Sequence, residues 1–450
     1  YNNKGKPWRQ FEPFFSATHV FEFAVHAGVS AVLFYDPVER VVATLHPNDS
    51  WEKVVFDPWR QETWDVNDTV LLDPREDSDV RGYVKQYLDG LDGRTGGWKS
   101  WYAQRVDGAL GDQEQQAAEK TAAHTNTPTC AWMDSLGRRV ITVAHNRLYR
   151  GGAVSDEYYA TRAVLDIEGN QRDVIDALGR SVMRYGFDML GNAQYQASME
   201  SGTRWNLNDV GNSPIYTWNS RGFRLHMEYD QLRRPIRQWV QEGNGQELLA
   251  ERTLYGEIYP NAAALNLRGK SYYQFDNAGV VRHDRYDYKG NLLLSTRRLS
   301  KEYRRTATWH ELEIELNVES LKIESIEDKL ESLLEDTKLC GETAYDAHNR
   351  PIKVKSPDAT IAFLTYNEAN LLERLDAQLG ESATRKSFIN DVDYDAHGRR
   401  QYISYGNGVT TSFKYDDRTF RLSNLKTVRE GSVLQDFQYT YDAAGNITRI

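Results

Sequence analysis

One short phrase recurs along the chain: an aromatic or apolar residue, then Asp or Asn, two variable residues, and Gly or Asn, often followed by Arg or Asn. Copies occur at residues 133–138, 175–180, 187–192, 218–222, 275–279, 394–399 and 441–446. Asp or Asn bonds back onto the local backbone, and Gly three positions later accepts a positive φ, which is the pattern of a type I turn. The phrase predicts a repeat protein, and it restricts the fold more than any single residue.

Each phrase is predicted to be the corner of a β-hairpin, because a positive-φ Gly after a type I turn makes the bulge that lets the next strand return. The predicted turn glycines are Gly137, Gly179, Gly191, Gly222, Gly279, Gly398 and Gly445. Between the corners lie β-favouring runs with a two-residue period, such as 140–143 and 410–415. These runs predict antiparallel strands.

The spacing of the phrases fits strands of ordinary length. Gly179 and Gly191 are 12 residues apart, which leaves room for one strand and its turn. Tyr345 and Tyr366 are 21 residues apart, as are Tyr394 and Tyr415, so a two-strand unit repeats. The predicted fold class is mainly β, a stacked array of antiparallel hairpins.

Composition agrees with such an array. At 450 residues the chain exceeds the size at which single cores stop growing, but a repeat array needs only contacts between neighbours. The chain combines 27 Tyr and 11 Trp with a mean hydropathy of −0.68, which fits strands with one aromatic and one polar face. A net charge of −10 argues against a nucleic-acid or anionic-membrane surface, although a role in solubility alone explains the charge equally well. Two cysteines imply no disulfide framework.

The repeat is interrupted twice, which divides the chain into five predicted segments. Residues 1–73 are β-rich, with strands expected at 21–23, 29–35, 41–45 and 51–56. Residues 74–128 form a helical insertion, with helices expected at 78–88 and 112–124. Residues 129–300 and 342–450 are repeat arrays, and 301–341 is a helical or irregular insertion with apolar residues at helical spacing from Leu321 to Leu334. The start at Tyr1 without Met, and the end just after a Tyr-Asp turn, suggest a fragment of a longer polypeptide.

The catalytic motifs considered below are all incomplete in this sequence. No Ser lies in a Gly-x-Ser-x-Gly nucleophile elbow. Residues 93–100 come nearest to a phosphate loop, but Trp98 stands where Gly must precede the Lys. The His310-Glu311 pair lacks the second His of a zinc helix. Turn chemistry explains the carboxylate clusters near Asp173 and Asp391, so we expect no enzyme, cofactor or metal site.

Several passages resemble a known family. The Tyr-Asp-x-x-Gly-Arg phrases resemble the YD repeats of Rhs proteins, and residues 9–15, 160–171 and 176–180 are similar to the B component of bacterial insecticidal Tc toxins. The resemblance spans nearly the whole chain. It implies a sheet that spirals into a hollow cocoon, closed with the C component, that holds a cytotoxic effector. Residues 1–73 would then belong to the middle region of the B component.

The resemblance also implies the partners. They would be the C component and, indirectly through regions absent here, the pore-forming A component, in a secreted complex with no direct membrane insertion. The Asp-Pro-x-Gly motifs of the C component's protease are missing, because Asp36-Pro37, Asp57-Pro58 and Asp73-Pro74 all lack the Gly. The alternative function is an extracellular adhesion or carbohydrate-binding module, since animal teneurins also build YD shells.

Overall fold

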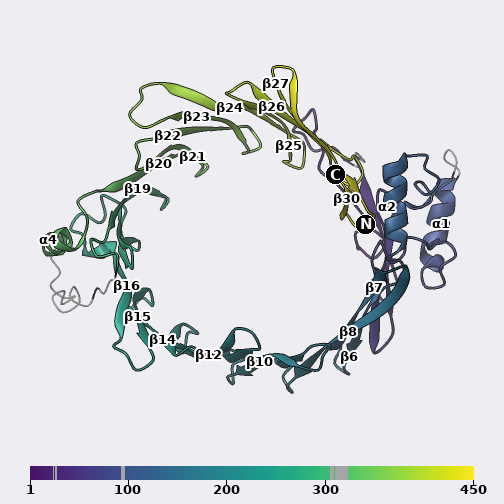
Figure 1. Cartoon of the computed structure of the whole chain (residues 1–450), viewed down its shortest axis with the longest axis horizontal. Helices are drawn as coiled ribbons and strands as arrows, with labels where there is room; N and C mark the ends of the chain where they lie inside the picture. The colour runs from purple at the N-terminus through teal and green to yellow at the C-terminus, as the bar shows by residue number, and fades with distance from the viewer. Residues whose placement is uncertain (24, 26–27, 93–96, 305–308, 310–322) are drawn as a thin grey trace. The chain divides into compact units, whose positions relative to one another are not determined.

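The computed structural model describes residues 1–23, 25, 28–92, 97–304, 309 and 323–450. The chain forms two compact units, one of Tyr1–Ser181 with Asp391–Ile450 and the other of Val182–Asn390. Both consist mostly of antiparallel strands joined by short turns (Figure 1). The predicted fold class, mainly β and antiparallel, is confirmed.

The first unit begins with nine strands, and consecutive strands pair antiparallel from β1 to β9. They are β1 (Arg9–Phe11), β2 (Ser30–Tyr35), β3 (Val41–Leu45), β4 (Trp51–Phe56), β5 (Arg60–Trp64), β6 (Thr129–Met133), β7 (Arg139–Arg150), β8 (Ala153–Leu165) and β9 (Gln171–Ile175). The C-terminal strands of this unit are β25 (Arg400–Tyr405), β26 (Val409–Tyr415), β27 (Leu422–Arg429), β28 (Ser432–Gln438), β29 (Thr440–Tyr441) and β30 (Ile447–Arg449).

Two helices, α1 (Arg81–Asp92) and α2 (Asp112–Ala122), connect β5 to β6 (Figure 1). Helix α1 packs against the N-terminal strands, and α2 packs against Val66, Val70 and the turn between β29 and β30. The apolar side of α1, with Val84 and Leu88, is buried against Val32, Leu45 and Trp51. Both predicted helices are present, although α1 begins three residues and ends four residues later than expected. The predicted segment boundaries at 73, 128, 300 and 341 stay predictions.

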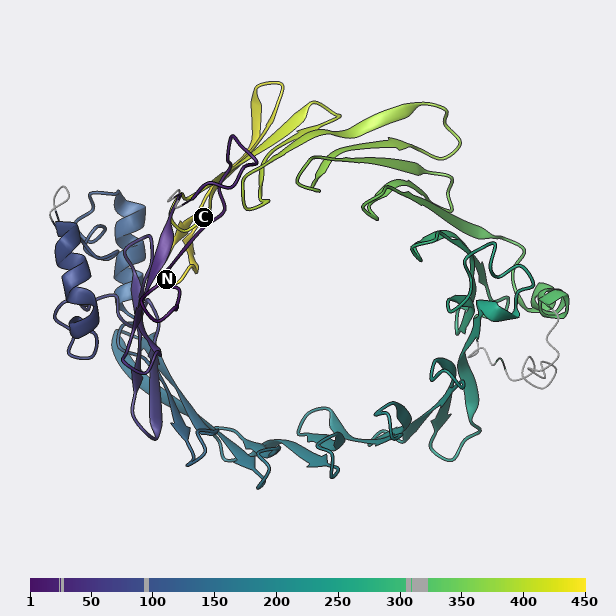
Figure 2. The same ribbon diagram turned by 180° about the vertical axis from the view of Figure 1, so that it is seen from behind.

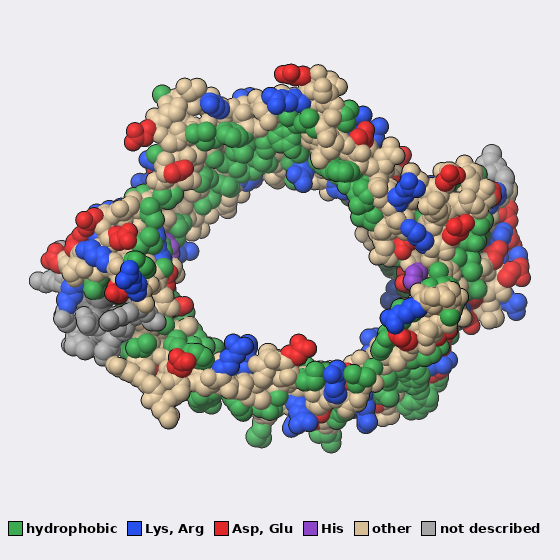
Figure 3. Space-filling model, in the orientation of Figure 1, with side chains coloured by type: hydrophobic (Ala, Val, Ile, Leu, Met, Phe, Trp, Pro, Cys, Tyr) green, Lys and Arg blue, Asp and Glu red, His purple; other side chains and the backbone are tan. Residues whose placement is uncertain are grey.

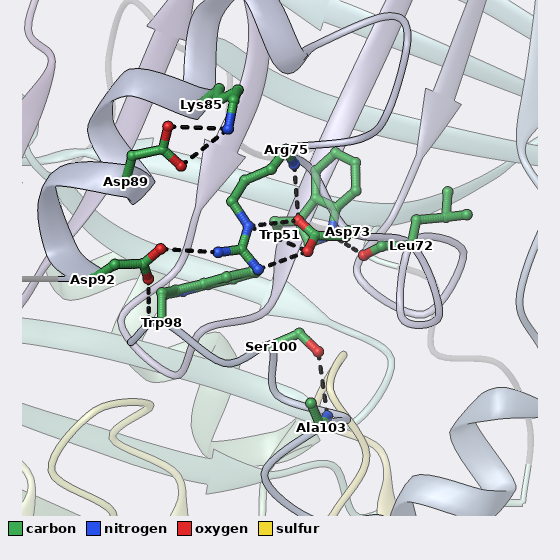
Figure 4. A network of polar contacts seen from close by, with 10 residues as sticks. All are labelled: Trp51, Leu72, Asp73, Arg75, Lys85, Asp89, Asp92, Trp98, Ser100 and Ala103. Atoms are coloured by element: carbon green, nitrogen blue, oxygen red, sulfur yellow. Dashed lines mark hydrogen bonds and ion pairs between the residues drawn. The ribbon is translucent and has the colours of Figure 1, made fainter. Parts of the chain in front are cut away.

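Arg75 holds the chain segment before α1 in place (Figure 4). Its guanidinium bonds the carboxylates of Asp73, at 2.7 Å, and Asp92, at 3.2 Å, and lies over the Trp98 ring. The indole N–H of Trp51 donates to the Leu72 carbonyl at 3.2 Å. These contacts fix the helical insertion to the first hairpins.

The second unit contains strands β10 to β24, and its only described α-helix, α4 (Ile323–Leu333), lies beside β16–β19 (Figure 2). The strands are β10 (Ser181–Phe187), β11 (Ala193–Ser198), β12 (Gly202–Asn208), β13 (Pro214–Asn219), β14 (Phe223–Tyr229), β15 (Pro235–Glu242), β16 (Leu248–Tyr255), β17 (Ser271–Asp276), β18 (Gly279–Tyr286), β19 (Leu292–Leu299), β20 (Leu339–Tyr345), β21 (Pro351–Lys355), β22 (Ile361–Tyr366), β23 (Leu372–Gln378) and β24 (Arg385–Tyr394). Ile326 and Leu330 of α4 are buried with Tyr273 and Phe275, so the main core of this unit lies beneath the helix.

Elsewhere the sheet is a single layer. None of the residues from 132 to 248 is buried, although this stretch contains most of β7 to β15. Charged side chains of both signs and hydrophobic side chains are interspersed over the visible surface of these strands (Figure 3). Stability in this region must therefore come from pairing and side-chain contact between neighbouring strands.

One predicted strand is wrong, two strands were missed, and some predictions fall outside the described residues. Residues 21–23 form no strand, and Phe21 and Phe23 are exposed, because no neighbouring strand pairs with this stretch. Strands β1 and β5 were not predicted. Residues 93–96, His310, Glu311 and Leu321 lie outside the described part of the chain, so neither the absence of a phosphate loop nor that of a zinc helix is tested there.

Candidate functional site

The repeated turn is the feature of the molecule with the most regular side-chain chemistry. In one copy, the backbone N–H of Gly179 donates to the Asp176 carbonyl at 2.9 Å, and the N–H of Asp176 donates to the Arg180 carbonyl at 2.9 Å. The Asp176 carboxylate accepts the N–H groups of Leu178 and Arg180, both at 2.9 Å, and the Arg180 guanidinium at 2.6 Å. The bond from the Arg180 side chain is the main reason that the pKa of Asp176 is lowered.

Six of the seven predicted turn glycines lie in such turns. Their φ angles are positive: Gly137 74°, Gly179 76°, Gly191 80°, Gly222 85°, Gly398 75° and Gly445 107°. Gly279 is different, because it is the first residue of β18, after the two-residue turn Asn277-Ala278, and has a φ of 137°. A Cβ there would lie 2.2 Å from the Arg298 carbonyl oxygen, so close strand approach excludes a side chain.

Other turns have the same geometry without glycine. The predicted phrase, with Gly or Asn at its fourth position, covers those of Asn349 and Asn370 but not the others. Positive φ occurs at the fourth turn position in Glu39, Asn212, Arg233, Asn349, Ala359 and Asn370. In most of these the first residue is still Asp or Asn, and its side chain bonds the backbone two and four residues later, as Asp230 bonds Leu232 and Arg234 at 2.9 Å. In the turns of Glu39, Arg233 and Asn349, the signal is an Asp that follows Tyr and precedes Arg by four positions. The turns of Asn212, Ala359 and Asn370 lack this signal.

The aromatic residue before the Asp connects one repeat to the next. The Tyr366 hydroxyl donates to the Pro351 carbonyl at 2.9 Å, and the Arg350 guanidinium lies 4.6 Å from the centre of the Tyr366 ring. Arg350 is itself paired with Asp346 in the preceding turn at 2.7 Å. Tyr366 therefore bridges two consecutive two-strand units, and burial there raises the pKa of its hydroxyl.

This Tyr–Arg–Asp arrangement recurs in both units. The Tyr415 hydroxyl donates to the Arg400 carbonyl at 2.9 Å, with Arg399 4.2 Å from its ring. In the second unit, the Tyr255 hydroxyl donates to the Pro235 carbonyl at 3.1 Å, with Arg234 3.9 Å from its ring. The period of about 21 residues is thus explained by a side-chain contact that each repeat makes with the preceding one.

Aromatic rings also form a ladder across β11–β14. Tyr195 and Trp205 have ring centres 5.6 Å apart, and Tyr216 lies parallel to both Trp218, at 5.6 Å, and His226, at 4.4 Å. Tyr216 is stacked on both of its neighbours, whereas Tyr195 and Trp205 are tilted by 45° and Trp205 is 40% exposed. Contacts of this kind between neighbouring strands stabilise a single-layer sheet.

Among the described residues, no group of three or more His, Cys, Asp or Glu side chains is placed to hold a metal. The Ser271 hydroxyl lies 3.0 Å from Nδ1 of His283, but that nitrogen also lies 3.2 Å from the Ser271 carbonyl oxygen. Burial lowers the pKa of His283. No carboxylate is recorded on the other ring nitrogen in the described part of the chain, so a third group that would orient His283 as a base is missing.

Cavities in the described structure differ in size. The space between α4 and β17–β19, lined by Arg282, Glu327 and Leu330, has a volume of about 90 Å³, below the roughly 300 Å³ of ordinary ligand pockets. Three wider hollows, of about 490, 430 and 920 Å³, are lined mostly by charged and polar side chains. In the described residues no helix is both long and apolar enough to cross a membrane. The turns and the aromatic ladder therefore fix each described repeat to its neighbours.

This repeat sheet has the fold of Tc-toxin proteins. No family model matches the chain. It is 22% identical to the toxin subunit YenC1 of Yersinia entomophaga over 73% of its length, and 26% identical to YenC2 of the same organism over 72%. The crystal structure of TcdB2-TccC3 matches 93% of this chain with a TM-score of 0.74 at 21% identity, and the Photorhabdus luminescens Tc holotoxin pore matches 93% with a TM-score of 0.73 at 20% identity.

The matches cover only part of the relatives. The chain spans 34% and 35% of the lengths of YenC1 and YenC2, and 18% of the TcdB2-TccC3 chain. In sequence and in fold it is similar to Tc-toxin subunits.

Proposed function

We propose that this chain is a non-enzymatic wall segment of a Tc-toxin B component. Together with a C component, it would enclose a cytotoxic effector before the effector enters a host cell. The main support for this proposal is the single-layer repeat sheet, whose fold matches TcdB2-TccC3 over 93% of the chain. A sheet without a second layer encloses the most volume per residue, which suits a container.

The side chains support a passive role. The Asp carboxylates of the turns are occupied by local backbone N–H groups and by Arg or Asn, as at Asp176 and Asp346. The aromatic rings of β11–β14 contact one another. A catalytic site needs groups left available for a substrate, and these groups are used to hold the wall.

The assignment to the B rather than the C component rests on the resemblance of residues 9–15 and 160–171 to B components. A B component is expected to require a separate C component for assembly, to reach the A-component pore only through regions outside this chain, and to be secreted as part of the complex. A C component would instead carry its own effector downstream of the repeats.

The test is to express the complete B protein with its C component and to add an external protease. We expect the cleaved effector to be protected while it stays with the complex, and to be digested when residues 129–300 are deleted. Equal digestion with and without this segment would contradict the container. An effector encoded in the same polypeptide as this chain would contradict only the assignment to the B component.

A further inference from the structure

Strands β7 and β8 are the longest of the described strands, and together they form a hairpin that extends beyond its neighbours. Strand β6 pairs with β7 only over residues 139–143, and β9 pairs with β8 only over residues 162–165. Residues 144–150 and 153–161 pair only with each other among the described strands. We call these two stretches the hairpin arm.

Side-chain contacts brace the hairpin arm. The rings of His145 and Tyr158 are stacked with their centres 4.4 Å apart, and the Arg147 guanidinium bonds the Asp156 carboxylate at 2.7 Å. The same guanidinium donates to the Thr125 carbonyl at 2.7 Å, which fixes the arm to the segment between α2 and β6. A surface that is ordered before binding loses less conformational entropy when a partner arrives.

The two edges of the hairpin arm differ. On the β7 side, Arg147 contacts Thr125, so the segment that leads into β6 lies beside this edge. On the β8 side, β9 ends at Ile175 and the chain reverses in the turn of residues 176–180. Residues 153–161 of β8, which we call the β8 edge, therefore have no strand beside them among the described residues.

The turn at the end of the arm determines which backbone groups of β8 face outward. Gly151 and Gly152 have φ angles of 58° and 82°, as in a two-residue type I′ turn, so Arg150 and Ala153 form a hydrogen-bonded pair. Bonded and non-bonded pairs then alternate along the hairpin, whose register is unbroken. The residues whose N–H and C=O groups point away from β7 are Val154, Asp156, Tyr158 and Ala160.

The β8 edge lacks the features with which natural proteins usually block the addition of a strand. It contains no Pro, no Lys and no bulge, and Val154 and Tyr158 are 54% and 64% exposed. It carries Asp156 and Glu157 but no basic residue. A strand added here would therefore meet outward backbone donors and acceptors beside two acidic side chains.

We propose that the β8 edge binds an extended, basic segment of a partner polypeptide as an added strand. Backbone hydrogen bonds would supply the affinity, and the two acidic residues would select Lys or Arg. A second copy of β8 is disfavoured, because antiparallel pairing of two such edges brings Asp156 and Glu157 next to the same residues of the copy. The edge has room for one segment, since β9 occupies the same side of β8 from Arg162 onward. This inference goes beyond the proposed function and does not depend on it.

The first test uses a fluorescein-labelled peptide with the sequence of residues 142–150, which is basic and matches the strand that already pairs with the other edge of β8. Fluorescence anisotropy should show saturable binding to this chain. Ala160→Pro removes an outward N–H but no bond to β7, and should weaken binding at least tenfold. The control Ala160→Thr keeps the N–H and should bind as the parent does. A parent that does not bind, or a Pro variant that binds equally well, would overturn the proposal.

A second peptide tests the role of the acidic residues. It has Glu in place of the residues that correspond to Arg147 and Arg150, and should bind at least tenfold more weakly than the basic peptide. The difference should shrink at high salt, because salt screens exposed charges. Equal affinity of the two peptides at low salt would overturn the assignment of a basic partner.

Hydrogen exchange resolved by residue locates the peptide without any variant. Binding should slow exchange at least tenfold at the outward amides of Val154, Asp156, Tyr158 and Ala160. The amides of Ser155 and Glu157 already bond β7 and should not change. Protection at another exposed strand such as β28 would place the peptide elsewhere and overturn the proposal. Dimerisation of this chain alone that Ala160→Pro abolishes would also overturn it, because the partner would then be a second copy.

Discussion

The fourth residue of each turn adopts a left-handed backbone conformation, and its identity decides how much that conformation costs. Gly179 has a φ of 76° and nothing within 4 Å of the position of a Cβ, so a substitution there changes backbone strain without creating a clash. Ala359 has a φ of 65° at the equivalent position of another turn. Removing Gly at position 179 and introducing Gly at position 359 therefore change the backbone strain at positive φ in opposite directions.

Gly179→Val is expected to lower the free energy of unfolding by roughly 1–3 kcal/mol, because a β-branched residue is forced into positive φ. The measurement is urea denaturation followed by tryptophan fluorescence. Gly179→Asn is the matched control and should cost less, since Asn tolerates this region. Ala359→Gly should stabilise by up to about 1 kcal/mol. A Gly179→Val variant as stable as the parent would contradict the role given to this position.

The sequence predicts the turns well where Gly or Asn occupies the fourth position and poorly where another residue does. The Asp230 carboxylate bonds the Leu232 and Arg234 N–H groups and the Arg234 side chain, which stabilises the turn enough for Arg233 to adopt a left-handed φ. A pattern that requires Gly or Asn therefore misses this turn. Gly279 shows the opposite case. It fits the phrase, but it lies in β18, where the backbone of β19 is too close for a side chain.

At the scale of secondary-structure elements, Ala443 in the turn between β29 and β30 is buried against α2. A larger side chain at this position tests whether the contact holds the helix in place. Ala443→Leu should destabilise the first unit by roughly 1–3 kcal/mol, because the cluster of Val66, Ala117 and Ala118 leaves no room for extra methylenes. Hydrogen exchange of the α2 amides should accelerate.

Ala444→Leu is the control, since that side chain is exposed in the same turn and should change stability by less than about 0.5 kcal/mol. If both substitutions leave α2 exchange unchanged, the turn does not hold the helix. Nothing in the local sequence predicts this contact, because residues 67 and 442 are brought together only by the path of the chain between them. The helices themselves were predictable from composition, but not the surfaces they cover.

At the scale of the whole molecule, the turns make the free energy of unfolding decrease at low pH. The pKa values of Asp134, Asp176, Asp209 and Asp346 are all lowered from the ordinary value of 3.8, through bonds from backbone N–H groups and from Arg side chains. A lowered folded-state pKa contributes stability that is present above the unfolded value and is lost as pH falls below it.

We therefore expect the midpoint of urea denaturation to be nearly constant from pH 7 to about 5 and to fall progressively below about pH 4. Because many turn carboxylates titrate together, the midpoint should fall more steeply with pH than it would for one carboxylate. In the Asp176→Asn variant the midpoint should fall less steeply, since one carboxyl group with a lowered pKa is removed. A midpoint that rises on acidification would contradict the assignment.

The single-layer region between residues 132 and 248 also bears on how the chain reaches its structure. Each strand from β7 to β15 pairs with the strand that precedes it in the sequence. No residue of these strands is buried, so none depends on packing against a part of the chain that is distant in the sequence. Loop closure between neighbours is fast and costs little entropy. The sheet can accordingly form hairpin by hairpin as the polypeptide leaves the ribosome, with each finished strand acting as the template for the one that emerges next.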